Sequence, residues 1–153
     1  MSFSGNSNAD STTTVSNDGW WPDLGVAEFQ SRYRMPKEYA EKVLIDGLQI
    51  GMAWANEQLE AWRVEQEATG SANLAAVESP KLGNESLKLI HYRRAVFSHA
   101  KAYLLQQFPT INRREASGNE ARESDDTEDK FLEYAQAAIA SFLGKGFITA
   151  ELI

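Results

Sequence analysis

Apolar residues cover two faces of the stretch from Leu87 to Phe108, LKLIHYRRAVFSHAKAYLLQQF, which contains no Gly or Pro. The first face repeats at spacings of three and four, as one side of a helix does, through Leu89, Tyr92, Val96, Ala100 and Tyr103. The second face consists of Ile90, Phe97, Leu104 and Leu105. A helix that is apolar on two faces usually lies between other elements. The pattern therefore predicts the central helix of a small bundle.

A second helical pattern begins near Pro36, which suits a first helical turn, and continues to about Glu67. Gly47 and Gly51 lie four residues apart on its apolar side. Each glycine costs a helix up to about 1 kcal/mol relative to Ala. We therefore expect another helix to approach closely at these two positions. The apolar side comprises Ala40, Val43, Leu44, Gly47, Leu48, Gly51, Trp54, Ala55, Leu59 and Trp62.

Two shorter helical patterns flank these long ones. The first covers Leu24–Arg34 and has Asp23 as its candidate cap. The other begins at Ser124 or Asp125, has acids in its first turn, and ends before Gly144. We predict an all-α bundle of three main helices plus a short N-terminal helix, with extended N- and C-terminal arms. Its divisions are a disordered leader (1–16), the bundle (17–143) and a C-terminal arm (144–153).

Composition narrows the possible functions. The 153 residues carry a formal net charge of −7, which disfavours broad binding to duplex DNA. No apolar run approaches the roughly 20 residues of a membrane span, so no membrane partner is expected. The absence of Cys excludes disulfides and thiolate chemistry, and it suits a reducing cytosol.

The sequence lacks the motifs of catalysis and cofactor binding. It has no Gly-rich phosphate loop and no GxSxG motif. His91 and His99 lie about 80° apart around a helix, which is poor geometry for one metal ion. The acids of Glu123–Asp129 lack the ligand spacing and the Gly of a calcium loop. We predict no enzyme activity, no metal and no cofactor.

Three features exceed what a plain bundle needs. Trp20 and Trp21 follow a turn signal, and they either pack onto the bundle or anchor a partner. Arg93 and Arg94 point to different sides of the central helix, and they form salt bridges within the bundle or ion pairs across a subunit boundary. The third feature is the apolar tail, Phe147–Ile153, which follows a Gly144–Lys145–Gly146 hinge. It docks on its own bundle or, as we favour, adds a strand to a neighbouring molecule.

These features, in this order, resemble the head completion (head stabilisation) proteins called GpL, from temperate phages with contractile tails. The resemblance covers nearly the whole chain past the leader, and it rests on an ordered set of segments rather than on one specific motif. The segments are Asn17–Asp23, Ala61–Arg63, Tyr92–Val96, Ala100–Ala102, Leu104–Leu105 and Thr149–Ile153.

The resemblance implies a structural virion protein that joins the head at the portal vertex after DNA packaging. It would complete and stabilise the DNA-filled head and form an adaptor ring, dodecameric in such proteins, to which the tail or neck attaches. Its partners would be the portal protein, neighbouring copies and a tail or neck protein, while DNA passes through the lumen without specific binding. The protein would assemble in the host cytoplasm and reside at the head–tail junction of the virion.

On this interpretation the interaction residues lie mainly near the chain ends. Candidates for protein contacts are Trp20, Trp21, Arg93, Arg94, Phe147, Ile148, Thr149, Leu152 and Ile153. Candidates for an acidic surface that faces the lumen or the tail are Glu123, Asp125, Asp126, Glu128 and Asp129. Two alternatives remain open at this point: a small nucleic-acid-binding subunit that assists DNA packaging, and a generic helical adaptor between proteins.

Overall fold

Helices dominate the computed structural model, which describes residues 12–109 and 127–145. The helices in these ranges are α1 (Val26–Arg32), α2 (Glu41–Gln58), α3 (Glu60–Ala68), α4 (Leu87–Gln107) and α6 (Glu128–Phe142), together with the 3-10 turn η2 (Leu74–Ala76). Strand β1 (Thr14–Val15) pairs antiparallel with β2 (Leu24–Gly25), and β3 (Lys81–Leu82) pairs antiparallel with β4 (Glu85–Ser86).

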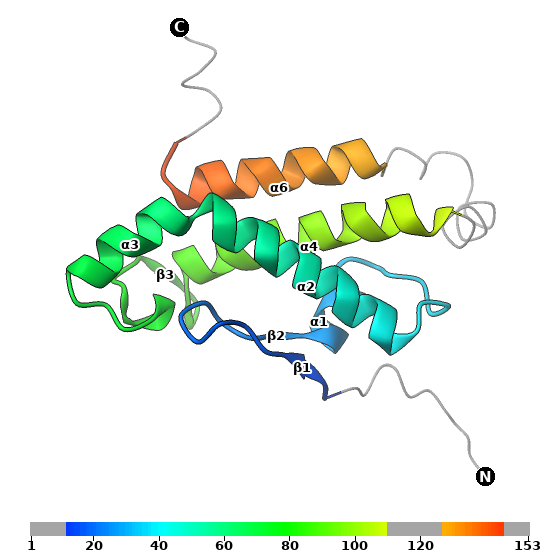
Figure 1. Cartoon of the computed structure of the whole chain (residues 1–153), viewed down its shortest axis with the longest axis horizontal. Helices are drawn as coiled ribbons and strands as arrows, with labels where there is room; N and C mark the ends of the chain where they lie inside the picture. Colours follow the sequence, from blue (N-terminus) through cyan, green and yellow to red (C-terminus); the bar gives the residue numbers. More distant parts are fainter. Residues whose placement is uncertain (1–11, 110–126, 146–153) are drawn as a thin grey trace, which may run out of the picture.

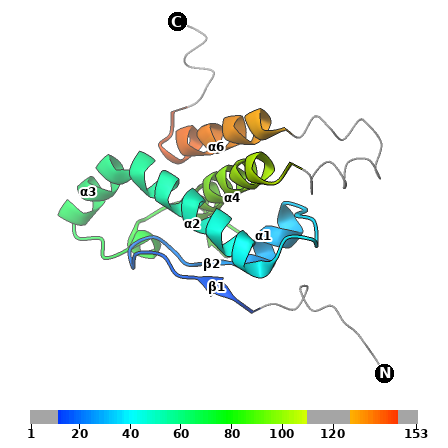
Figure 2. The ribbon, with the colours of Figure 1, turned by 45° about the vertical axis from the view of Figure 1, so that its right-hand side comes forward.

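Helix α4 occupies the centre of this arrangement, as the two apolar faces predict. It lies between α2 and α6, and the segment that carries β1, β2 and α1 covers a further side (Figures 1 and 2). Its start is set by Ser86, whose hydroxyl accepts a hydrogen bond from the Leu89 N–H at 3.0 Å. Tyr92, Val96 and Phe97 are all fully buried in it. The predicted central helix is therefore confirmed, with its end one residue earlier than expected.

Close approach of α2 to α4 explains the two helical glycines. A Cβ added to Gly51 would lie 2.5 Å from the Val96 carbonyl oxygen, and one added to Gly47 would lie 2.9 Å from Leu104 Cδ1. Real Cβ atoms do not come so close to other heavy atoms. The expectation that a second helix packs against these positions is confirmed.

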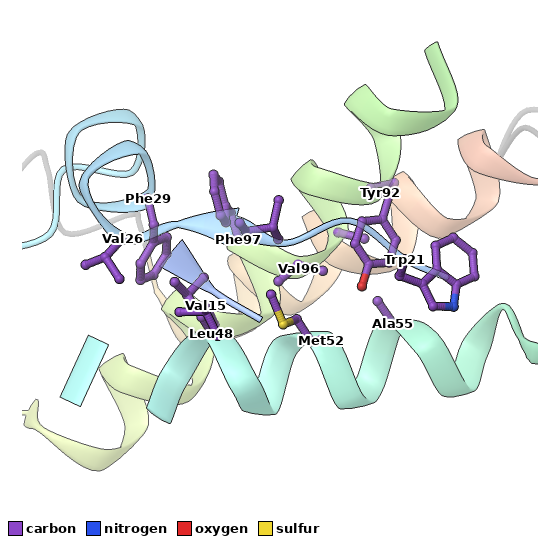
Figure 3. Packing of buried hydrophobic residues seen from close by; sticks show 14 of the residues in the cluster. Val15, Trp21, Val26, Phe29, Leu48, Met52, Ala55, Tyr92, Val96 and Phe97 are labelled. Carbon is purple, nitrogen blue, oxygen red and sulfur yellow. The ribbon is translucent and has the colours of Figure 1, made fainter. Parts of the chain in front are cut away.

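The core is continuous from β1 to α6. Figure 3 shows side chains from α2 (Leu48, Met52, Ala55) facing those from α4 (Tyr92, Val96, Phe97). Val26 and Phe29 of α1 close the same core at one end, and Trp21 closes it at the other (Figure 3). Val15 of β1 is only 4% exposed, so the packed part of the chain begins before Asn17, inside the segment assigned to the leader.

The prediction of a purely α fold is only roughly correct, because two small antiparallel sheets accompany the helices. Each strand is two residues long, too short for an alternating pattern to show in the sequence. Gly83, with φ +64°, begins the two-residue loop that joins β3 to β4, as expected of a type II′ hairpin turn.

The single helix predicted over residues 36–67 is two helices that meet at Leu59. Residues 36–40 form a turn, closed by the Tyr39 N–H donating to the Pro36 carbonyl, and α2 begins at Glu41. At Leu59 the backbone departs from helical geometry (φ −107°, ψ 12°) while its side chain stays fully buried. This bend keeps Leu59 in the core and directs Trp62 of α3 toward Trp20, with ring centroids 5.9 Å apart. Periodicity does not reveal a bend that leaves the apolar positions in register.

Two predicted helix caps are wrong. Asp23 does not cap α1, whose N-cap is Gly25, because the Asp23 carboxylate accepts the Asn17 N–H instead. Helix α6 is capped by Thr127, whose hydroxyl accepts the Lys130 N–H at 3.3 Å, rather than by Ser124 or Asp125. Thr127 can take this position because a threonine hydroxyl, like an aspartate carboxylate, accepts a hydrogen bond from an N–H of the first turn.

Candidate interaction surfaces

The turn Asn17–Asp23 is held by a carboxylate at its centre. Asp18 Oδ1 accepts the backbone N–H groups of Trp20 and Trp21 at 3.0 and 3.1 Å, and its Oδ2 lies 2.9 Å from Nη1 of Arg63 on α3. Burial alone would raise the pKa of Asp18, but the two N–H donors and Arg63 outweigh it and lower the pKa below its ordinary value. Asp18 therefore shapes the turn and ties it to α3.

A three-membered polar network ties the same turn to two more helices. Asn17 Nδ2 donates to the Tyr92 hydroxyl at 2.9 Å, that hydroxyl donates to Asn56 Oδ1 at 2.6 Å, and Asn56 Nδ2 donates back to Asn17 Oδ1 at 3.0 Å. Burial of the Tyr92 hydroxyl raises its pKa far above the ordinary value. The network joins the turn to α2 and α4 at one point, so it holds the turn against the bundle.

The two tryptophans of this turn lie in the interior of the molecule. Trp20 is 4% exposed and Trp21 is 2% exposed. The Trp21 ring stacks on Tyr92, with centroids 4.7 Å apart and an interplanar angle of 9°. An anchor that inserts into a partner needs an exposed ring, and neither ring is exposed here. In the structure, therefore, Trp20 and Trp21 pack onto the bundle, which is one of the two alternatives that the sequence allows.

Arg93 and Arg94 have separate environments, as their positions on the helix predict. Arg93 is 8% exposed and makes a bidentate pair with Glu85, at 2.8 and 3.0 Å. It also lies 3.6 Å from Glu28. The hydrogen bond to Glu85 raises the pKa of Arg93 and lowers that of Glu85. Arg93 thus forms salt bridges within the bundle, to α1 and β4 and not to the last helix. Arg94 is exposed and has no ion-pair partner among the described residues.

Arg94 belongs to a hollow of about 320 Å³ that the sequence did not indicate. We call it the basic hollow. Four cations line it, namely Arg32, Arg34, Arg94 and Lys101, and the rest of its lining is Tyr33, Ser98, Phe131 and Tyr134. The Lys101 ammonium donates to the Tyr33 carbonyl at 2.6 Å and lies 4.8 Å from the Phe131 ring centroid. Helices α1, α4 and α6 all contribute to this surface, so no single segment of the sequence predicts it.

One residue of the basic hollow has an unusual backbone. Arg34 has φ +52°, which makes it the one residue other than glycine with positive φ in the described part of the chain. It follows the end of α1, and the Met35 N–H donates to the Gln30 carbonyl, as in a Schellman motif. Helices α3 and α6 end in the same motif, with Gly70 and Gly144 at the matching positions. Of these three helices, only α1 is followed by a residue with a side chain at the positive-φ position.

The end of α6 is held against the start of α4. The Lys88 ammonium donates to the Phe142 carbonyl and lies 4.7 Å from the Phe142 ring centroid. A cation at the carbonyl end of a helix is favoured by the helix dipole. Burial lowers the pKa of Lys88. This contact holds the last turn of α6 against α4.

Several predicted interaction residues lie outside the described residues. These are the tail candidates Phe147, Ile148, Thr149, Leu152 and Ile153, and the acids Glu123, Asp125 and Asp126. Of the remaining acids, Glu128 is half-buried and Asp129 is exposed, both in the first turn of α6.

The two histidines do not form a joint site. His99 stacks on Trp54 with ring centroids 4.6 Å apart, and burial lowers the pKa of both His91 and His99. Within residues 12–109 and 127–145, no three potential metal ligands cluster. No helix in those ranges is long and apolar enough to cross a membrane.

The described residues define a mostly helical protein, with two small antiparallel sheets and a core that is continuous from β1 to α6. The chain belongs to the phage head completion protein (GPL) family, whose model matches residues 15–153. This confirms the family that the sequence segments suggest.

Two relatives support the assignment. A head completion/stabilization protein of Escherichia phage P2 is 28% identical over 131 residues, covering 86% of this chain and 78% of the relative. A probable head completion/stabilization protein of Haemophilus phage HP1 (strain HP1c1) is 27% identical over 143 residues, covering 94% of each chain. No solved structure matches the chain.

Proposed function

We propose that this chain is a structural virion protein that completes and stabilises the DNA-filled head of a phage. The observation that carries the proposal is the match of residues 15–153 to the head completion family, together with two relatives that bear that name. The part of the chain that the structure describes is consistent with this function, because its polar networks tie segments together and none assembles a nucleophile, a base or a metal site.

The finer proposal is an adaptor ring at the portal vertex, with the tail or neck bound to its outer side. Such a ring needs contacts between two different patches on each subunit, repeated around an axis until they close. Lys88 supports this idea, because its bond to the Phe142 carbonyl holds the end of α6, which the C-terminal segment follows in the sequence. A segment that starts from a fixed point can reach the same place on every neighbour. We propose that the segment Phe147–Ile153 binds the portal or a neighbouring copy, with Leu152 and Ile153 as its apolar anchors.

The acids around the start of α6 have a separate proposed role. Glu123, Asp125, Asp126, Glu128 and Asp129 would face the lumen or the tail. An acidic lumen repels DNA phosphates, so DNA would slide past during ejection without being held. The net charge of −7 supports this role over a DNA-binding one.

A complementation experiment tests the function. Infection with a phage that lacks this chain should yield packaged heads that lose their DNA and do not join tails. Purified chain, added to those heads, should restore DNA retention and infectivity. Normal retention in its absence would contradict the proposal.

The role of the C-terminal segment is tested by the variant Leu152→Ser/Ile153→Ser, with Glu151→Gln as the matched control. The serine variant should keep its helical circular dichroism and fail to join heads, while the control should complement fully. If the serine variant complements as well as the control does, the segment is not an anchor.

A further inference from the structure

The basic hollow concentrates positive charge on one surface of a chain that is acidic overall. The chain carries 22 acidic and 15 basic residues, yet four basic residues line this one surface. Two of them, Arg34 and Arg94, are exposed and have no ion-pair partner among the described residues. Phe131 and Tyr134 add aromatic rings to its lining, and Tyr134 is 42% exposed. A lining that combines cations with an exposed aromatic ring suits a ligand that combines acids with an apolar side chain.

The backbone of Arg34 is the second observation, and it is independent of the charge count. A side chain at positive φ is strained, and glycine relieves that strain at the ends of α3 and α6. Strain of this kind persists only where the surrounding structure over-determines the conformation, and strained residues cluster at binding and active sites. At the end of α1 the residue in that position is an arginine that lines the basic hollow.

The chain itself carries a surface with the opposite character. We call it the α3 tip, and it consists of Glu60, Val64 and Glu65 of α3 together with Glu57 of α2, which lies just before the bend at Leu59. Helix α3 has no buried residue, and Val64 is 52% exposed. The three glutamates are exposed and have no ion-pair partner among the described residues. Glu60 lies one helical turn before Val64, so the α3 tip presents acids beside an exposed apolar residue, which is the complement of the basic hollow.

The two surfaces cannot meet within one molecule. Figure 1 shows α3 at one end of the long axis, whereas α1 and the first turns of α6, which line the basic hollow, lie toward the other end. A contact between them must join two copies through different patches. Such a contact is heterologous, so it closes into a ring when the rotation permits.

We propose that the basic hollow of one copy binds the α3 tip of its neighbour. This inference rests on the proposed function, because it names the contact between neighbouring copies in the assembled head. Arg34 and Arg94 pair with the glutamates of the neighbour, and Val64 packs against the exposed ring of Tyr134. A nucleic-acid backbone is a poorer occupant, since it would have to approach an acidic molecule to reach two free arginines.

Cysteine cross-linking on heads tests the contact directly, because the chain contains no Cys of its own. Copies with Val64→Cys are mixed with copies with Tyr134→Cys, bound to packaged heads and treated with a short bismaleimide. The expected product is a cross-linked dimer of one copy of each kind. The control pair, Gln49→Cys with Tyr134→Cys, should give none, since Gln49 is an exposed residue of α2 outside both surfaces. Heads that carry the protein and complete normally, yet give no Val64–Tyr134 product, would overturn the contact and leave the proposed function intact. Heads that never bind the protein would refute both.

Charge reversal then tests the pairing. Arg34→Glu/Arg94→Glu should lower the yield of the cross-linked dimer by more than about tenfold, since like charges in contact cost several kcal/mol. Adding Glu60→Arg/Glu65→Arg to the partner copies should restore it. Arg34→Gly removes the side chain while relieving the backbone strain, so the variant should remain folded and still lower the yield of the cross-linked dimer.

The proposal is overturned if the arginine variants lose head binding while the α3 variants do not, which would indicate another head protein in the hollow. It is also overturned if the arginine variants lose binding to duplex DNA that the parent protein shows at low salt.

Discussion

Gly51 of α2 lies directly against Val96 of α4: a Cβ on the glycine would lie 2.5 Å from the valine carbonyl oxygen. Backbone oxygens cannot move aside as the end of a side chain can, so Gly51→Ala must push the two helices apart. We expect the variant to lose about 1–3 kcal/mol in the free energy of unfolding, the usual cost of overpacking, in spite of the up to about 1 kcal/mol that Ala gains in a helix. Urea denaturation followed by circular dichroism measures it.

Gly47→Ala is the matched control. There the added Cβ would meet Leu104 Cδ1 at 2.9 Å, the end of a side chain that can change rotamer. Its loss of stability should be smaller than that of Gly51→Ala. A Gly51→Ala variant more stable than the parent would contradict the close approach of α2 and α4.

Removal of both rings of the Trp pair should unfold the protein. A buried Trp→Ala change costs about 3–5 kcal/mol, and two such changes approach the whole stability of a small domain, about 5–15 kcal/mol. The sequence alone allowed the opposite outcome, in which Trp20→Ala/Trp21→Ala folds but fails to complete heads. Circular dichroism and the cooperativity of thermal unfolding separate the two. Val64→Ala is the control: because Val64 is exposed, the change should alter the free energy of unfolding by no more than about 0.5 kcal/mol.

Asp18 should contribute stability that disappears in acid. Its pKa in the folded protein lies below the ordinary value of 3.8, because the N–H groups of Trp21 and Trp20 and the charge of Arg63 favour the carboxylate. The unfolded chain therefore takes up the proton first as the pH falls. The stability that Asp18 supplies is fully present above about pH 4 and is lost as the pH falls through the folded pKa.

The test compares the parent protein with Asp18→Asn in urea denaturation between about pH 2 and pH 7. The parent should be more stable near neutral pH by about 1–2 kcal/mol, the scale of hydrogen bonds to a charged group at a partly exposed site. The difference should shrink below pH 4. Because other carboxylates, such as Glu85, titrate in both proteins, they cancel in the comparison. A difference that stays constant with pH would show that the charge of Asp18 does not matter.

The helices that span several turns were predictable, and the features that depend on two distant segments were not. Two apolar faces place α4 at the centre, and Gly47 and Gly51 indicate a close neighbour, because each of these signals lies within one helix. The bend at Leu59 and the two-residue strands leave no periodic trace. The basic hollow combines residues of α1, α4 and α6 that are up to 102 positions apart, from Arg32 to Tyr134. One local signal did exist: the sequence Tyr33–Arg34–Met35–Pro36 ends a helix without a glycine.

The Trp pair is a second feature that depends on distant segments and that the sequence alone does not settle. A pair of aromatic rings after a turn suits both a core and an interface, and sequence does not separate them. Asn56 and Tyr92 decide the matter, because their side chains bind Asn17 and hold the turn against the bundle. Neither residue stands out by pattern, since an Asn on a helix and a Tyr on an apolar face are both common.

Tyr92→Phe tests whether the polar network holds that turn. The change removes a hydroxyl that accepts from Asn17 and donates to Asn56, and it leaves both amides with one partner fewer in a partly buried site. We expect a loss of about 1–3 kcal/mol in unfolding free energy, the cost of leaving a buried polar group unsatisfied. Tyr103→Phe, on the same helix, is the control and should change stability by no more than about 0.5 kcal/mol. Equal effects of the two changes would show that water replaces the hydroxyl and that the network is not essential.

Arg34→Gly should stabilise the protein. The arginine occupies a left-handed backbone conformation, with φ +52°, that costs a side chain about 1–2 kcal/mol. Glycine adopts it without that penalty but loses more backbone freedom on folding, which leaves a net gain of roughly 0.5–1 kcal/mol. Thermal and urea unfolding measure the gain. Arg94→Gln, which changes charge without relieving any backbone strain, should leave stability within about 0.5 kcal/mol of the parent. If Arg34→Gly is less stable than the parent, the arginine makes contacts that outweigh its strain, and its role is to stabilise the fold of the single chain. If it is more stable, the arginine reduces the stability of the isolated chain, and that result supports a role in contacts formed only on assembly.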